Sequence, residues 1–249
     1  MVLVWNEFAF GSSDLCATLV AFNSMLTLIL YTFYAYALID KLLPAMGVAT
    51  AAVPVESATF FLQVLESVAI YLGIPFVMGL GCWIVLRKIK GEEWYYNKFV
   101  KWISPLTLGA LLFTIVLLFA MQGYSVISRP LDILLVAAPM LIYFIVMFVI
   151  SFFMTYFLEY DYPASATVAF TAASNNFELA LAIAISVFGS DSNAAFATII
   201  GPLVEIPVML ILVYVSKLFG RLCYKNGPWR WSKVTAQKRD EPPPALELK

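Results

Sequence analysis

Residues 172–180 read AASNNFELA, and this short stretch decides how the chain must be folded. It places a hydroxyl, two amides and a carboxylate between Ser174 and Glu178, inside an otherwise apolar run. No other residue from Ala164 to Phe188 carries a charge. Polar groups at this density are costly in hydrocarbon unless they line a cavity or are buried in protein. The stretch therefore predicts a functional interruption inside a membrane-spanning helix.

The composition of the whole chain is that of an integral membrane protein. Of its 249 residues, 62% are hydrophobic and 12% are charged, and the mean hydropathy is +0.89. Soluble domains carry about 25% charged residues. The sequence has no histidine, which excludes imidazole metal sites and histidine-dependent nucleophilic catalysis. Because the three cysteines are far apart and no nucleophile–base pair is visible, we expect no enzyme activity, no cofactor and no metal site.

Six apolar segments are each long enough to cross a bilayer, which takes about 20 residues. Helices are the only plausible spans, because backbone groups in hydrocarbon must be satisfied within the segment. The sequence thus predicts an all-α polytopic membrane protein of about six transmembrane helices, with a partial one at residues 1–9. The six segments run over residues 15–39, 58–86, 104–121, 131–158, 164–188 and 194–218.

Basic residues predict the orientation of these spans. Five lie between Arg87 and Lys101, and seven lie between Arg221 and Lys249. We therefore expect an integral protein of the plasma membrane with both ends in the cytoplasm. Residues 219–249 form a polar tail that we expect to be disordered. Its charges indicate solvation and topology, so no nucleic-acid partner is expected.

The two ends of the chain echo one another. FGSSD at residues 10–14 precedes a span that carries Asn23, and FGSDS at residues 188–192 precedes a span that carries Glu205. Many transporters consist of two such repeats with broken helices near the bilayer midplane. If the echo reflects a repeat, the second copy is complete here and only the end of the first is present.

Several features favour a helix break at the polar stretch. Ser and Asn side chains compete for backbone hydrogen bonds, so local unwinding is expected near Ser174, Asn175 and Asn176. A half-helix beginning near Glu178 would direct free N–H groups and a positive dipole towards the gap. Phe170 lies on the same helical face as Ser174, four positions away.

Glu205 is a second intramembrane carboxylate, placed between Pro202 and Pro207, which we expect to bend its helix. Burying such a group costs at least about 2.5 kcal/mol. Apart from the terminal Lys217, neither its span nor that of Glu178 holds a basic residue. Burial without a counter-charge favours the protonated carboxyl group, so both acids could exchange protons or hold a cation.

A competing interpretation is that Ser, Asn and Glu only join helices by hydrogen bonds. This applies to Asn23 as readily as a functional role does. It accounts poorly for four polar groups in the five positions from Ser174 to Glu178.

Long motifs in these spans resemble a known family. FTAASNNFELALAIAISVFG (170–189) and AAFATIIGPLVEIPVMLILVYV (194–215) closely resemble arsenite efflux permeases of the arsenical-resistance family, in the bile acid/sodium symporter-like superfamily. The resemblance extends in order through MVLVWNEFA (1–9), LVAFNSMLTLILY (19–31), ESVAIYLGIPF (66–76) and KWISPLTLGALLFTIVLLF (101–119).

The resemblance implies ten helices in two inverted repeats, with the fourth and ninth helices broken and crossing at the substrate site. Residues 1–40 would then be the end of the first repeat, residues 41–218 the second repeat of five helices, and residues 219–249 the tail. The family's essential cysteine lies just before the MVLVW motif. The chain begins at the Met of that motif, so we expect an N-terminally truncated member.

The resemblance also implies a function and a site. We expect export of arsenite, or antimonite, by proton antiport, with the solute, protons and the lipid bilayer as partners. Glu178 would exchange the proton, while Ser174 and Asn176 would orient the hydroxyls of the solute. Gly73 and Pro75 would be kink residues. The substrate- and proton-binding residues would be Trp5, Asn23, Phe170, Ser174, Asn175, Asn176, Glu178 and Glu205.

Two other functions remain open at this point. Sodium-coupled symport of organic anions occurs in the same superfamily, and Glu178 with neighbouring carbonyl groups could ligate sodium. A non-transporting membrane scaffold or pseudo-transporter fragment is also compatible with a missing cysteine.

Overall fold

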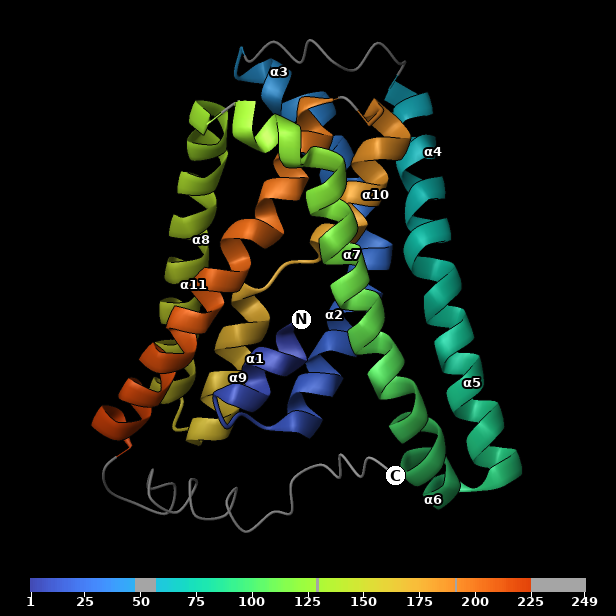
Figure 1. Cartoon of the computed structure of the whole chain (residues 1–249), viewed down its shortest axis with the longest axis vertical. Coiled ribbons are helices and arrows are strands. Elements are labelled where there is room, and N and C mark those ends of the chain that lie inside the picture. Colours follow the sequence, from blue (N-terminus) through green and yellow to red (C-terminus); the bar gives the residue numbers. More distant parts are fainter. Residues whose placement is uncertain (48–56, 129, 191, 225–249) are drawn as a thin grey trace. The chain divides into compact units, whose positions relative to one another are not determined.

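The structure, a computed structural model, describes residues 1–47, 57–128, 130–190 and 192–224. In these ranges it is almost entirely helical and contains no β-strand (Figure 1). The expected all-α fold is therefore confirmed. Most of the predicted tail, residues 225–249, lies outside the described part, while the last helix continues to Cys223.

The helical elements follow one another with few intervening residues, and three of them, labelled η, have π-helical hydrogen bonding. In chain order they are α1 (Val2–Phe8), α2 (Ser13–Ala35), η1 (Tyr36–Leu42), α3 (Leu43–Ala45), α4 (Ser57–Val68), η2 (Ala69–Gly73), α5 (Ile74–Lys90), α6 (Glu92–Trp94), η3 (Tyr95–Val100), α7 (Lys101–Ser128), α8 (Pro130–Phe157), α9 (Tyr162–Ala173), α10 (Phe177–Phe188) and α11 (Asn193–Cys223).

Five helical stretches among the described residues are long and apolar enough to cross a membrane, as an integral membrane protein requires. The sixth predicted span, residues 104–121, falls inside α7, which is a continuous helix of 28 residues. The five stretches are Ser13–Ala45, Ala58–Lys90, Pro130–Phe157, Tyr162–Phe188 and Asn193–Cys223.

A tight turn joins α8 to α9. The backbone N–H of Tyr160 donates to the Thr155 carbonyl at 3.1 Å, and that of Glu159 donates to Tyr156 at 3.0 Å. This is a Schellman ending, with Glu159 in the left-handed region at φ 61°. Asp161 then caps α9, because its Oδ1 accepts from the Ala164 N–H at 2.9 Å. The two helices therefore meet with their terminal backbone groups satisfied.

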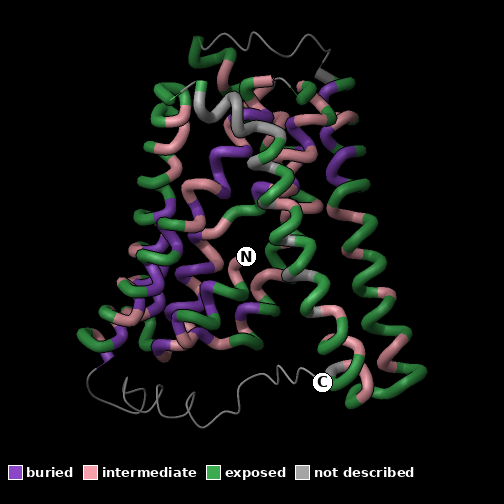
Figure 2. The backbone as a smooth tube through the Cα atoms, in the orientation of Figure 1, coloured by how far each residue is buried: buried purple, intermediate pink, exposed green. Residues whose placement is uncertain are grey.

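The described residues form two compact units. The first comprises residues 1–23, 136–176 and the chain from residue 201. Its core is aromatic: Phe144, Phe148 and Phe152 recur every four residues along α8 and are fully buried. Buried stretches also recur along the backbone of α9 and α11 (Figure 2). Phe148 meets the Phe170 ring of α9 edge-on at 5.0 Å. Such edge-to-face pairs stabilise by about 0.5–1.5 kcal/mol beyond area burial.

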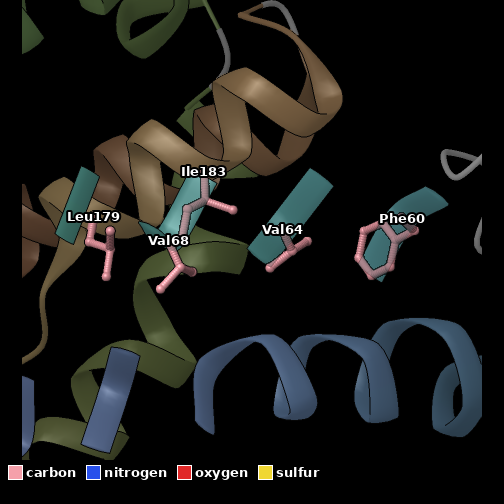
Figure 3. Packing of buried hydrophobic residues seen from close by; sticks show 5 residues of the cluster. All are labelled: Phe60, Val64, Val68, Leu179 and Ile183. Carbon is pink, nitrogen blue, oxygen red and sulfur yellow. The ribbon is translucent and has the colours of Figure 1, made fainter. Parts of the chain in front are cut away.

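The second unit comprises residues 24–135 and 177–200. In its core Phe60, Val64 and Val68 of α4 pack with Leu179 and Ile183 of α10 (Figure 3). The hydroxyls of Ser67 and Ser186 lie 2.5 Å apart and add a polar tie between the same two helices. Within a membrane the hydrophobic effect does not drive helices together, so serine hydrogen bonds of this kind supplement the van der Waals packing between them.

The predicted kink residues lie at an irregularity within this unit. Gly73 ends the π-helical segment η2, and Pro75 occupies the second position of α5. Because α4, η2 and α5 follow one another without a break, Pro75 withholds a backbone N–H from the carbonyl about one turn earlier. The Ala58–Lys90 stretch is thus locally irregular at these residues. That the helix kinks there stays a prediction.

Candidate functional site

The predicted helix break is present. Helix α9 ends at Ala173 and α10 begins at Phe177, with residues 174–176 in neither helix (Figure 1). Ser174 has φ −76° and ψ 146°, which is an extended conformation. The apolar Tyr162–Phe188 stretch therefore carries an extended segment at its polar residues.

Ser174 contacts the second predicted carboxylate. Its Oγ donates a hydrogen bond to Glu205 Oε1 at 2.7 Å, across 31 positions of sequence. Glu205 is only 2% exposed. A short bond to a carboxylate is charge-assisted and roughly twice as strong as a neutral one. The structure thus brings together two residues that sequence reasoning assigned to one site.

Helix α11 carries Glu205 without interruption. It runs as one helix of 31 residues through both Pro202 and Pro207. Each proline withholds an N–H from the carbonyl four positions earlier, so each local ladder loses a bond. The carboxylate is therefore presented from a continuous helix whose own hydrogen bonding is weakened on both sides of it.

Tyr143 of α8 is a contact that the sequence did not indicate. Its hydroxyl donates to the Ala172 carbonyl at 3.3 Å and lies 3.5 Å from Asn175 Oδ1. Ala172 is in the last turn of α9, where carbonyls lack intrahelical donors. Tyr143 therefore caps the end of α9 from outside and adjoins the break. A Tyr within the mostly apolar α8 sequence was its only signal.

Other predicted residues occupy separate positions. Glu178 lies in the first turn of α10, directly after the break. Asn175 and Asn176 are exposed in the break, and Asn23 is exposed on α2. Phe170 is fully buried against Phe148, so its described contact is core packing within the first unit.

Trp5 is buried in α1, with 7% of its surface exposed. Its ring meets Phe8 edge-on at 6.3 Å. Within the described part of the chain its indole Nε1–H has no hydrogen-bond partner. A buried indole usually finds an acceptor, because an unsatisfied donor costs about 1–3 kcal/mol. Trp5 thus offers an unused donor.

A buried hydrogen-bond network holds the end of α1 against α9. Thr167 Oγ1 donates to Asn6 Oδ1 at 2.8 Å and accepts from the Ser12 N–H at 2.9 Å. Asn6 Nδ2 donates to the Ser12 carbonyl at 3.2 Å. Gly11 passes so close that a Cβ there would overlap Asn6 Oδ1. These partners are up to 161 positions apart, and no pattern in the sequence marks them.

Tyr162 makes a second tie between the same elements. Its hydroxyl donates to the Ala9 carbonyl at 2.7 Å and lies 3.0 Å from Ser216 Oγ on α11. Tyr162 and Ser216 are fully buried. The described ends of α1, α9 and α11 are therefore joined through one phenol.

Metal-binding groups do not gather in the described ranges. No three Cys, Asp or Glu residues lie close enough together there to hold an ion. Cys16 is buried, Cys82 is exposed and Cys223 is intermediate, and all three are free thiols.

These features define a polytopic membrane protein with a broken helix and a buried carboxylate between apolar spans. The sequence profile described as "Sodium Bile acid symporter family" matches residues 1–129. The chain therefore belongs to the sodium bile acid symporter family.

Curated relatives match over most of the chain. The Arsenical-resistance protein Acr3 of Corynebacterium glutamicum is 42% identical over 92% of this chain and 60% of its own length. That of Alkaliphilus metalliredigens is 33% identical over 87% of the chain and 57% of its own length. An uncharacterized transporter of Synechocystis is 36% identical over 87% and 53%. The chain thus spans between 53% and 60% of these relatives. No solved structure matches.

Proposed function

We propose that the protein carrying this chain exports arsenite, or antimonite, across the plasma membrane in exchange for protons. The relatives named for arsenical resistance support the substrate class. The observation that carries the proposal is the Ser174–Glu205 hydrogen bond beside a helix break, because it places an acid and a hydroxyl inside an apolar bundle. Such placements mark ion and solute pathways.

The proposed roles follow from the chemistry of each group. Arsenous acid is a neutral molecule with three hydroxyls, so it needs both donors and acceptors. Ser174 and Asn176 supply both kinds and would orient those hydroxyls. Trp5 would add its unused indole donor. Glu178 would load and release the exchanged proton.

Four further predicted residues complete the proposed site. Glu205 would support the site by holding the Ser174 hydroxyl in place, or would take part in the proton route. Asn175 would act beside Tyr143, and Asn23 would contribute an amide from α2. Phe170 would shape the site from beneath as part of the buried aromatic core.

The experiment that tests the proton site replaces Glu178 by Gln, which has the same shape but cannot titrate. In the complete gene product, we expect Glu178→Gln to abolish arsenite resistance in a sensitive host while membrane insertion is unchanged. Glu66→Gln is the matched control, because Glu66 is an exposed acid of α4. Resistance that survives Glu178→Gln would remove Glu178 from the proton pathway.

The description of the family favours one alternative, sodium-coupled symport of an organic anion. In that case the acids would help to ligate sodium instead of carrying a proton. A non-transporting role is the other alternative, and it predicts that the complete gene product gives no resistance even when it is inserted in the membrane.

We also propose that both ends of the chain, and the loop from Arg87 to Lys101, face the cytoplasm. The five basic residues between Arg87 and Lys101 support this orientation. We likewise propose that the first repeat ends at residue 40 and that the second repeat runs from residue 41 to residue 218.

A further inference from the structure

We propose that the Arg87–Lys101 hairpin of the second unit holds a binding site for one anionic phospholipid on α5. The site has two parts: a basic notch at the end of the helix, and an apolar stripe that leads away from it. Neither part belongs to the candidate transport site.

The notch is shallow and open, with a volume of about 340 Å³, and is lined by Trp83, Ile84, Arg87, Lys88 and Glu92. Arg87 lies 4.5 Å above the Trp83 ring, and its Nη2 is 2.6 Å from Glu92 Oε1. The arginine is therefore held in place by a cation–π contact and an ion pair.

Lys88 supplies the uncompensated charge. It is exposed on the rim of the notch and forms no ion pair with any residue that the structure describes. The Arg87–Lys101 segment as a whole carries five basic and two acidic residues, a net charge of +3. A single phosphate beside Lys88 would complement this excess.

An apolar stripe continues from Lys88 along one face of α5. The stripe consists of Val77, Leu80 and Ile84, and Lys88 follows it. The successive spacings are three, four and four positions, so all four residues lie on one side of the helix. The three apolar side chains are exposed. A lipid with its phosphate at Lys88 would lay an acyl chain along this stripe.

The expected position of the notch along the membrane normal favours a lipid over a free anion as its ligand. Helix α5 closes the apolar Ala58–Lys90 stretch, so we expect its last turn to lie near the lipid headgroups. Trp83 beside the notch has the amphipathic ring that is enriched at this level. Clusters of basic residues directly outside a span attract anionic lipids.

The test is a titration of the purified full chain, in neutral detergent, with phosphatidylglycerol or phosphatidylcholine, followed by thermal shift. We expect Lys88→Gln to weaken the apparent affinity for phosphatidylglycerol by about fivefold, the factor for one interfacial lysine. Lys90→Gln is the matched control: it removes the same charge, but its position is about 200° around the helix.

Three results would overturn the proposal. One is an equal loss of affinity in Lys88→Gln and Lys90→Gln, which would mean diffuse attraction. Another is equal stabilisation by glycerophosphate or inorganic phosphate, which would mean a free-anion site. The third result comes from native mass spectrometry of the wild type in an equimolar lipid mixture. We expect phosphatidylglycerol to be retained preferentially, and equal retention of both lipids would contradict the proposal.

Discussion

Ser174 contributes a single hydroxyl, yet it holds a carboxylate with almost no access to water. Glu205 is 2% exposed, and Ser174 Oγ lies 2.7 Å from its Oε1. An acid in this position needs donors, because a buried ion without hydrogen bonds is strongly destabilised. The hydroxyl is available to do this because the break leaves Ser174 in an extended conformation.

Replacing Ser174 by Ala should weaken both the fold and transport. The variant leaves Glu205 without this donor, which we expect to cost about 1–3 kcal/mol of stability and to reduce arsenite uptake into inside-out vesicles. Melting temperature in detergent and initial uptake rate measure the two effects. Ser174→Thr keeps a hydroxyl and is expected to retain most of both. A Ser174→Ala variant indistinguishable from wild type would show that the bond is dispensable.

At the level of single residues, the sequence drew attention to polar side chains that interrupt apolar runs. Ser174, Glu178 and Glu205 stand out because each is polar in an apolar run, and the structure joins two of them. Tyr143 could not be predicted, since one phenol among apolar residues is equally compatible with lipid contact. The individual roles of these residues in transport stay predictions.

Among the elements, α1 and α9 are joined by an arrangement that tolerates no added atom. Gly11 lies where a Cβ would overlap Asn6 Oδ1 and come within 2.8 Å of Thr167 Oγ1. Because the chain passes so close to α9 at Gly11, the Ser12 N–H can donate to Thr167 Oγ1 at 2.9 Å. The glycine therefore fixes how closely the chain entering α2 can approach α9.

Gly11→Ala should consequently lower the melting temperature of the purified chain. Forcing a methyl group into this contact typically costs about 1–3 kcal/mol, because the hydrogen-bonded partners must move. Gly79→Ala is the control, since a Cβ at Gly79 meets nothing within 4 Å and alanine favours a helix by about 0.5–1 kcal/mol. If the two variants melted alike, the close packing at Gly11 would be of no energetic importance.

The elements also show where sequence reasoning stops. Long apolar runs and the SNN interruption predicted the spans and the break. The π-helical segments Ala69–Gly73 and Tyr95–Val100 have no comparable signal, because they depend on small shifts of hydrogen bonding within an otherwise helical sequence. The echo between the chain ends has a local counterpart: Ser12 accepts from the Leu15 N–H at the start of α2, and Ser192 from the Ala195 N–H at the start of α11.

For the whole molecule, the proposed exchange of arsenite for protons has a quantitative consequence. One pH unit supplies about 1.4 kcal/mol per proton, enough for about tenfold accumulation at one-to-one exchange. Inside-out vesicles containing the complete gene product should therefore accumulate arsenite when their interior is acidic, whether or not sodium is present.

The matched arm of this experiment imposes a sodium gradient at equal pH on both sides. Export by proton antiport predicts no accumulation in that arm. Accumulation that follows sodium alone would instead support the symporter alternative, and accumulation in neither arm would support a non-transporting role.

The boundary between the two compact units crosses the chain within α2, within α8, at the break and within α11. Three of these crossings lie inside helices that run without interruption, although Pro139 in α8 and Pro202 in α11 each remove one backbone N–H donor close to the crossing. The fourth crossing, residues 174–176, belongs to neither α9 nor α10. A change in the backbone torsions of these three residues would therefore alter how the Ser174 hydroxyl reaches Glu205.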